Sequence, residues 1–290
     1  MQNVKEKYPF FKKFEKLSII LAQDEGKKTK LFLDADGEGF TVVCGEREEN
    51  RLLFNNLNFL SRNLGEEILL PKVHAADKSL DWFIMDYVGG QNAKSLFMIK
   101  ADGEKIDTDK LADELYNLAH AIHNIPVHKQ QNNWRETITS EIEGYFQFFD
   151  EIGAIGDECF DRIRVLMNKL DSYFKQVIPR YIHDDFTAKN VCFDPCANKL
   201  FLVDFDTIKI GDPNIDISKS ITHSFGSDIF LRAQEKFYPN FDKDVCYFYG
   251  VRVSLFWLKS LHDRKLPEFS QRILEFKERI SGWEPSGANK

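Results

Sequence analysis

The sequence predicts an α+β protein of two lobes, a small antiparallel β-rich N-terminal lobe and a larger, mainly helical C-terminal lobe. Residues 28–44 contain two apolar segments joined by a turn, and residues 69–88 contain two more. Most of the chain after residue 107 shows a helical spacing of apolar residues instead. The Gly-led stretch GGQNAKSLF, residues 89–97, separates the two patterns. We therefore expect lobes of residues 1–89 and 90–290.

Composition limits the classes of function that the chain can have. Its 290 residues are 43% hydrophobic and 13% aromatic, which is typical of a folded globular protein. No apolar run approaches the roughly 20 residues that span a bilayer, and the N-terminal segment is too charged for a signal peptide, so we expect a cytoplasmic protein. A net charge of -7 disfavours binding to nucleic acid or to an anionic membrane. The five scattered cysteines indicate neither a disulfide framework nor a zinc site.

The N-terminal elements follow in order. Residues 28–44 predict a β-hairpin with its turn at Asp36 and Gly37. Leucine and phenylalanine residues at three- and four-residue spacing predict an amphipathic helix over residues 46–63. The stretches LLPKVHAAD, residues 69–77, and LDWFIMDYV, residues 80–88, predict two further strands.

The C-terminal elements are mainly helices. Apolar positions predict a helix over residues 107–125 that ends at Pro126, and a helical region over residues 136–178 that Gly153 and Gly156 interrupt. Residues 240–262 and 266–280 also have a helical pattern. The aromatic runs at residues 145–150 and 246–257 are expected to lie mainly in the core.

Acidic residues concentrate around three short apolar runs between residues 181 and 206. The pattern places Asp185 after one strand, Asn190 before the next, and Asp204 and Asp206 at the end of a third. We expect these four side chains to meet at one edge of a small sheet. Asn190 and Asp204 are oxygen ligands of the kind that Mg²⁺ uses together with substrate phosphates. Asp185 could then accept a proton from a substrate hydroxyl during phosphoryl transfer.

These residues resemble a known family. The stretch HDDFTAKN, residues 183–190, resembles the H-x-D-x-x-x-x-N catalytic loop of the protein-kinase-like fold, and VDFD, residues 203–206, resembles its D-F-G segment. GDPNIDI, residues 211–217, is similar to the G-D-P-x-x-D-[LI] segment of the aminoglycoside phosphotransferase and choline kinase-like family. FIMDYVGG and LAHAIHNIP resemble the hinge and a helix end of that family. The resemblance covers about residues 25–262.

The resemblance implies a role for each matching residue. Asp185 would be the catalytic base, and Asn190 and Asp204 the metal ligands. His183 would be a structural residue of the loop and Asp216 would brace its backbone. The cofactors would be ATP or GTP and Mg²⁺. The N-terminal lobe would bind the nucleotide, and the C-terminal lobe would carry the substrate cleft.

Further contacts are implied for the nucleotide and the acceptor. The main chain of Asp86 and Val88 would contact the base, and Asp204 would also contact the nucleotide through the metal. The acceptor would be a hydroxyl group of a small molecule: an aminoglycoside, a sugar or an amino alcohol. Asp184 replaces a glycine that is common in the family, and we expect that change to matter little.

One departure concerns the lysine that pairs with the nucleotide phosphates on the third strand. Residues 40–45 contain no cation, and Val43 or Cys44 occupies its place. Lys30 could substitute only by reaching across from the preceding strand. The acidic partner on the following helix would be Glu48 or Glu49. DEGKK, residues 24–28, holds a single glycine where a phosphate-binding loop would have more.

Alternative functions follow from these features. A catalytically reduced nucleotide-binding or regulatory pseudokinase would explain the missing lysine. A protein kinase is disfavoured, because GDPNID follows Asp204 too closely to leave room for an activation segment. His120, His123 and His128 are expected to be packing residues rather than a metal cluster. The acidic residues of the region 141–161 predict a solvated helix face, or else a cleft that attracts a cationic acceptor.

Overall fold

The computed structural model describes residues 2–24, 28–65, 68, 70–88, 91–92, 108–127, 133–194, 199–223 and 242–283. The chain forms two compact units, each built from two separate segments. The first unit contains Met1–Ile125 and Asp185–Ile208, and the second contains Pro126–Asp184 and Lys209–Lys290. These units differ from the lobes 1–89 and 90–290, which stay a prediction. Packing puts part of the helical sequence and the segment Asp185–Ile208 into the same unit as the N-terminal sheet.

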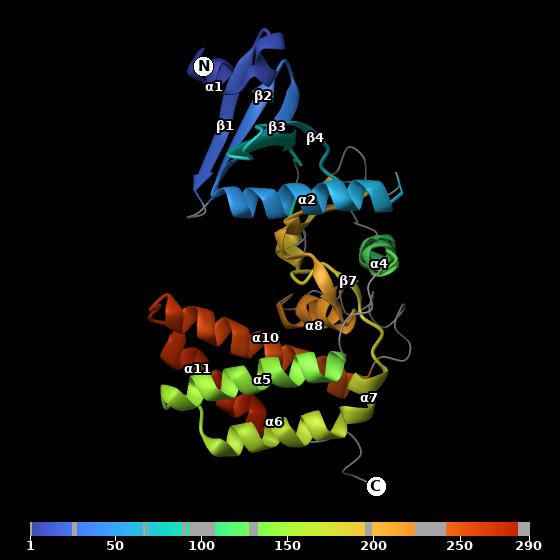
Figure 1. The fold of residues 1–290 in the computed structure, drawn as a ribbon, viewed down its shortest axis with the longest axis vertical. Helices are drawn as coiled ribbons and strands as arrows, with labels where there is room; N and C mark the ends of the chain where they lie inside the picture. Colours follow the sequence, from blue (N-terminus) through green and yellow to red (C-terminus); the bar gives the residue numbers. More distant parts are fainter. Residues whose placement is uncertain are drawn as a thin grey trace. The chain divides into compact units, whose positions relative to one another are not determined.

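The first unit contains a five-stranded sheet in which every neighbouring pair is antiparallel (Figure 1). Its order is β1 (Leu17–Asp24), β2 (Lys28–Ala35), β3 (Glu38–Gly45), β5 (Trp82–Asp86) and β4 (Val73–Ala76). The turn between β2 and β3 has positive φ at both central residues, 55° at Asp36 and 88° at Gly37. This geometry is typical of tight hairpins and confirms the predicted turn. Strand β1 was not predicted.

The two faces of this sheet have different coverings. Helix α1 (Gln2–Lys7) and the 3₁₀ turn η1 (Pro9–Lys13) lead into a cluster in which Tyr8 and Phe11 pack with Phe40 and Val42 of β3. Helix α2 (Arg47–Asn63) packs against β3, β4 and β5 (Figure 1). Its Phe54 ring contacts Phe83, the cross-strand partner of Val43.

The side chains of a strand alternate between its two faces. The contact between Phe54 and Phe83 therefore shows which residues of β3 face α2. Val43 lies on the α2 face and Cys44 on the opposite one, where Tyr8 Oη lies 3.0 Å from Cys44 Sγ. Cross-strand partners share a face, and Lys30 pairs with Val43 while Lys28 pairs with Gly45. Lys28 and Lys30 therefore belong to the face that α2 covers.

Two small sheets hold the strands around the candidate residues. In the first unit, β8 (Val191–Asp194) lies between β6 (Gln91–Asn92) and β9 (Lys199–Leu202), and helix α4 (Thr108–His123) packs on β9. In the second unit, β7 (Arg180–Ile182) pairs with β10 (Lys209–Gly211). The three predicted strands therefore do not form one small sheet, because β7 pairs with β10, which comes after the β8–β9 hairpin in the sequence.

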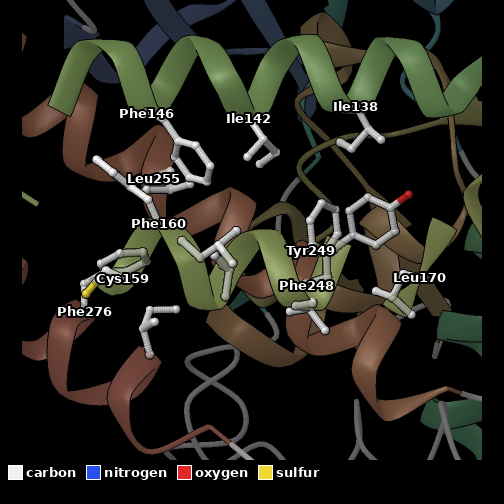
Figure 2. Packing of buried hydrophobic residues seen from close by; sticks show 14 of the residues in the cluster. Ile138, Ile142, Phe146, Cys159, Phe160, Leu170, Phe248, Tyr249, Leu255 and Phe276 are labelled. Carbon is white, nitrogen blue, oxygen red and sulfur yellow. The ribbon is translucent and has the colours of Figure 1, made fainter. Parts of the chain in front are cut away.

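The second unit is built mainly from helices around one apolar core. These are α5 (Trp134–Glu151), α6 (Asp157–Lys169), α7 (Asp171–Gln176), α8 (Asn214–His223), α10 (Lys243–Asp263) and α11 (Phe269–Ser281). In Figure 2, Ile138, Ile142 and Phe146 project from α5 toward this core. Gly153 and Gly156 separate α5 from α6 as predicted.

The aromatic runs of this unit are partly buried. Phe146 and Phe149 are buried in the first run, as are Phe248 and Tyr249 in the second. Phe256 and Trp257, at the end of the second run, are exposed. Among the helices that the structure describes, none has the length and apolar character needed to cross a membrane.

Candidate active site

The β8–β9 hairpin brings Asn190 and Asp204 to the same end of one small sheet. Val191 pairs with Leu202, and the Val203 N–H donates to the Asn190 carbonyl at 2.9 Å, so the ladder continues one step past the strands. Asn190 closes the 3₁₀ turn η2 (Ala188–Asn190), and Asp204 precedes the 3₁₀ turn η3 (Phe205–Thr207). Register and turns together position these two side chains.

The side chain of Asn190 also holds Asp185 in place. Its amide Nδ2 donates to Asp185 Oδ2 at 2.7 Å and to the Asp185 carbonyl at 2.9 Å. The Lys189 ammonium lies 2.9 Å from the same carboxylate oxygen. Asp185 is thereby fixed beside Asn190, while its side chain keeps 20% of its surface exposed.

The residues at this end of the hairpin suit a divalent cation. Both hydrogen bonds that the Asn190 side chain makes within the described part of the chain use Nδ2, which leaves its amide oxygen as a ligand atom. Asp204 adds a carboxylate. Among the described residues of this unit, Lys28 pairs with Asp206 and Glu49, and Lys189 pairs with Asp185. The amide oxygen of Asn190 and the carboxylate of Asp204 are hard oxygen ligands of the kind that fits the Mg²⁺ implied by the family resemblance.

Lys28 is a second cation of the first unit that lies near these residues, beside Asp206 and Glu49. Its Nζ is 2.5 Å from Asp206 Oδ2 and 3.9 Å from Glu49 Oε2, and its side chain is only 10% exposed. Asn56 of α2 donates to the Phe205 carbonyl at 2.7 Å, which holds the turn that carries Asp206 against the same helix. The structure therefore brings Glu49, rather than Glu48, to a lysine of β2.

Lys28 was not predicted, because the family resemblance places this lysine on β3 and Lys30 was the one substitute expected on the preceding strand. The signal available was the hairpin register. A two-residue turn at Asp36 and Gly37 pairs Lys28 with Gly45, directly before the helix that carries Glu49. Of the phosphate-loop stretch DEGKK, residues 25–27 lie outside the described residues.

The predicted hinge residues lie at the end of β5, where Asp86 is the last residue of the strand and Val88 comes two positions later. The Asp86 N–H donates to the Lys72 carbonyl at 3.0 Å, and its carboxylate accepts from the Lys72 N–H at 2.8 Å and lies 2.5 Å from His74 Nε2. The Asp86 side chain is thus bound to the neighbouring strand region. Contacts of Asp86 with a ligand would therefore use its carbonyl group.

In the second unit, Asp216 binds the backbone that precedes Asp185. Its Oδ2 accepts the His183 N–H and its Oδ1 accepts the Asp184 N–H, each at 2.8 Å. Asp216 is 1% exposed and His183 is fully buried. A buried carboxylate with two N–H donors is a strong, charge-assisted anchor for a loop.

Asp184 lies in a cluster of cations that the sequence did not reveal. Its carboxylate is 2.5 Å from Lys209 Nζ, 3.5 Å from Lys219 Nζ and 3.9 Å from Arg252 Nη1. Burial opposes the charge of Arg252, but Glu141 at 2.8 Å and Asp184 raise its pKa overall. The side chain of Asp184 is only 15% exposed and lies among three positive charges, surroundings that the expectation of a minor role did not include.

Other candidate residues have structural surroundings. His123 is buried, and His120 stacks on Tyr116, while His128 lies outside the described residues. Several acidic side chains of the region 141–161 form ion pairs, namely Glu141 with Arg252, Glu143 and Asp161 with Arg164, and Glu158 with Arg162.

Comparison with known proteins places this geometry in context. The model of the phosphotransferase enzyme family matches residues 46–249. No curated protein matches the sequence. A ternary complex of a thermostable mutant of aminoglycoside phosphotransferase APH(4)-Ia with AMP-PNP and hygromycin B is similar at 15% identity and a TM-score of 0.70, covering 99% of this chain and 100% of that one.

Two further solved structures have the same fold. The GDP complex of aminoglycoside 2'-phosphotransferase-IIIa has 12% identity and a TM-score of 0.69, covering 96% of this chain and 95% of that one. Choline kinase LicA from Streptococcus pneumoniae has 12% identity and a TM-score of 0.61, covering 97% and 99%. These similarities confirm the predicted α+β, protein-kinase-like fold and the family resemblance.

Proposed function

The chain belongs to the phosphotransferase enzyme family, and from this premise we propose that it transfers the γ-phosphoryl group of ATP or GTP to a hydroxyl group of a small molecule, with Mg²⁺. The observation that carries the proposal is the gathering of Asp185, Asn190 and Asp204 at one end of the β8–β9 hairpin. Phosphoryl transfer depends mainly on positioning and on charge neutralisation, which this set of groups can supply.

Asp185 is the proposed general base. As the acceptor oxygen bonds to the γ-phosphorus and the bond to the leaving oxygen breaks, the Asp185 carboxylate takes the hydroxyl proton. The amide of Asn190 supports this role because it holds Oδ2 of Asp185 in a fixed orientation at 2.7 Å. Asp216 and His183 support the loop that precedes this residue.

Asn190 and Asp204 are the proposed ligands of Mg²⁺. When bound, the metal would neutralise charge on the phosphate groups. Asn190 can contact Asp185 and the metal at the same time, because its Nδ2 donates to Asp185 while its amide oxygen can bind the metal.

The nucleotide base is proposed to contact the main chain of Asp86 and Val88. The involvement of the Asp86 side chain with Lys72 and His74 supports a main-chain contact. Similar structures contain AMP-PNP and GDP, so both ATP and GTP are candidate phosphoryl donors.

The acceptor is proposed to be an aminoglycoside, a sugar or an amino alcohol. Similar structures contain hygromycin B or kanamycin, and another is a choline kinase. We place the reaction in the cytoplasm, and the net charge of -7 argues against nucleic acid or an anionic membrane as partners. A cationic acceptor would suit this charge.

The competing hypothesis is a nucleotide-binding module without turnover, which the absence of a lysine from β3 suggested. A panel of aminoglycosides, sugars and amino alcohols, each with MgATP or MgGTP, separates the two hypotheses when phosphorylated products are detected by mass spectrometry. Under our proposal one acceptor class is phosphorylated. Nucleotide binding without any phosphorylated product would favour the module.

Once an acceptor is found, Asp185→Asn tests the general base. We expect kcat to fall by about 10²- to 10⁴-fold, with nucleotide affinity close to that of the wild type. The matched control is Asp263→Asn, which removes an exposed carboxylate paired with Lys259 on α10 and should leave kcat unchanged. An Asp185→Asn variant with wild-type kcat would refute the assignment.

A further inference from the structure

Lys28 is a buried cation with two acidic partners, which distinguishes it from a solvated surface lysine. It begins β2, keeps 10% of its side-chain surface exposed, and pairs with Asp206 at 2.5 Å and Glu49 at 3.9 Å. Burying an ammonium group is costly unless it is paired. Its carboxylate partners come from α2 and from the turn that follows Asp204.

We propose that Lys28 binds the phosphate groups of the nucleotide, supplying from β2 the positive charge that β3 lacks. This inference rests on the proposed function, because it assigns a further binding residue for the same nucleotide. Val43 supplies an aliphatic side chain to the α2 face of β3, and Cys44 turns to the opposite face toward Tyr8. Lys28 lies on the α2 face, and its ammonium group pairs with Glu49 and Asp206.

The geometry of the ammonium group leaves it able to bind a further anion. A lysine has three N–H donors. Among the residues that the structure describes, Asp206 occupies one of these donors at hydrogen-bond distance, whereas the 3.9 Å contact with Glu49 Oε2 is an ion pair longer than a hydrogen bond. The remaining donor capacity lies beside Asp206, two positions after the proposed metal ligand Asp204. A phosphate that binds metal at Asp204 would therefore be close to Lys28.

Glu49 and Asp206 are positioning residues in this proposal. They hold the charged side chain at the site, and the Asn56 contact with the Phe205 carbonyl ties one of them to α2. Lys189 is a poorer candidate for the same task, because its side chain is 52% exposed and pairs with Asp185.

The test compares binding of MgATP, MgGTP and adenosine by calorimetry to the wild type, Lys28→Met and the control Lys30→Met. The control makes the same substitution two positions along the same strand and face. We expect Lys28→Met to weaken binding of the triphosphate that the wild type binds by about tenfold to a hundredfold, the range for a lost charged hydrogen bond. Adenosine affinity should stay unchanged, and Lys30→Met should resemble the wild type.

The outcomes separate this inference from the proposed function. If the wild type and the Lys28→Met variant bind the triphosphate equally well, the assignment of Lys28 is overturned and the proposed function is not affected. Wild type that binds neither MgATP nor MgGTP overturns the proposed function and this assignment with it. A loss of adenosine affinity equal to the loss of triphosphate affinity also overturns it, because that result indicates a general structural effect.

Two measurements distinguish positioning from folding. Glu49→Gln should weaken triphosphate binding several-fold in the wild-type background and have little further effect in Lys28→Met, since coupled residues are not additive. Equal effects of Glu49→Gln in both backgrounds would overturn its positioning role. In the wild-type protein, MgATP or MgGTP, but not adenosine, should protect Lys28 from an amine-acylating reagent, read by peptide mass spectrometry. Unchanged labelling of Lys28 would overturn the inference without any variant having to fold.

Discussion

Asp184 combines an unusual backbone conformation with an unusual electrostatic environment. Its φ of 57° lies in the left-handed region, which favours glycine and which aspartate tolerates better than most residues. Glycine would relieve this conformation but would leave Lys209, Lys219 and Arg252 without their shared anion. The negative charge of its side chain, which pairs with these cations, therefore explains an aspartate at position 184, next to the proposed base.

Substitution of Asp184 by Asn tests this explanation. Asparagine keeps the size and the tolerance for positive φ but removes the charge, so we expect the free energy of unfolding to fall by about 3 kcal/mol, as when a buried ion pair loses one partner. Urea denaturation measures the change. Asp81→Asn is the control, because its pair with Arg47 is exposed and should contribute little to the free energy of unfolding. Equal losses in the two variants would contradict the prediction.

Helix α8 and the segment before it connect two parts of the second unit through two carboxylates. Asp212 accepts the Asn214 N–H at 2.9 Å and the Tyr249 hydroxyl at 2.7 Å, so it caps the first turn and also contacts α10. Asp216, one turn later, reaches the backbone of His183 and Asp184. The motif GDPNID therefore both caps a helix locally and holds the backbone of His183 and Asp184, directly before the proposed base.

Substitution of Asp216 by Ala should weaken this support. Two backbone N–H groups would lose their acceptor, and we expect a loss of about 3 kcal/mol in the free energy of unfolding, because buried unsatisfied donors are costly. The matched control on α8 is Ser220→Ala, because among the described residues the Ser220 hydroxyl donates within the helix, to the Ile217 carbonyl. Thermal and urea denaturation compare the two. A loss in Asp216→Ala no larger than in Ser220→Ala would contradict a supporting role.

At the scale of the whole molecule, titrating groups on both units limit the pH range of stability. Backbone hydrogen bonds from Lys16 and Glu15 lower the pKa of Asp36, and the hydrogen bond to Lys175 contributes most to the lowered pKa of Asp171. Burial raises the pKa of Cys246 to about 11 and that of Tyr145 to about 12. A lowered carboxyl pKa contributes stability above the unfolded pKa, which is lost as pH falls through the folded value. A raised thiol or phenol pKa contributes stability below the unfolded value, which is lost as pH rises toward the folded value.

We therefore expect the free energy of unfolding to decrease below about pH 4 and again above about pH 9. Urea denaturation over this pH range measures the profile. Cys246→Ser removes the thiol and should make the decline between about pH 9 and about pH 11 shallower. A Cys246→Ser variant with the same alkaline slope as the wild type would contradict the assignment of that decline to the thiol.

Features that depend on neighbouring positions could be predicted from the sequence. Asp36 and Gly37 specify a tight turn, apolar periodicity specifies the helices, and the five-residue spacing of Asp185 and Asn190 lets one short loop bring them together. The order of motifs along the chain then indicated the family and the fold. All of these signals come from local backbone preferences and from residues close in sequence.

Long-range packing settled the remaining features. Lys28 and Asp206 form an ion pair across 178 positions of sequence, and the rotation of α2 brings Glu49 rather than Glu48 within reach. The three cations around Asp184 come from β10, α8 and α10, and the strands β7 and β8 belong to different sheets. Strand register, helix rotation and the pairing of distant segments decide which side chains share a face, and these depend on the packing of the complete unit.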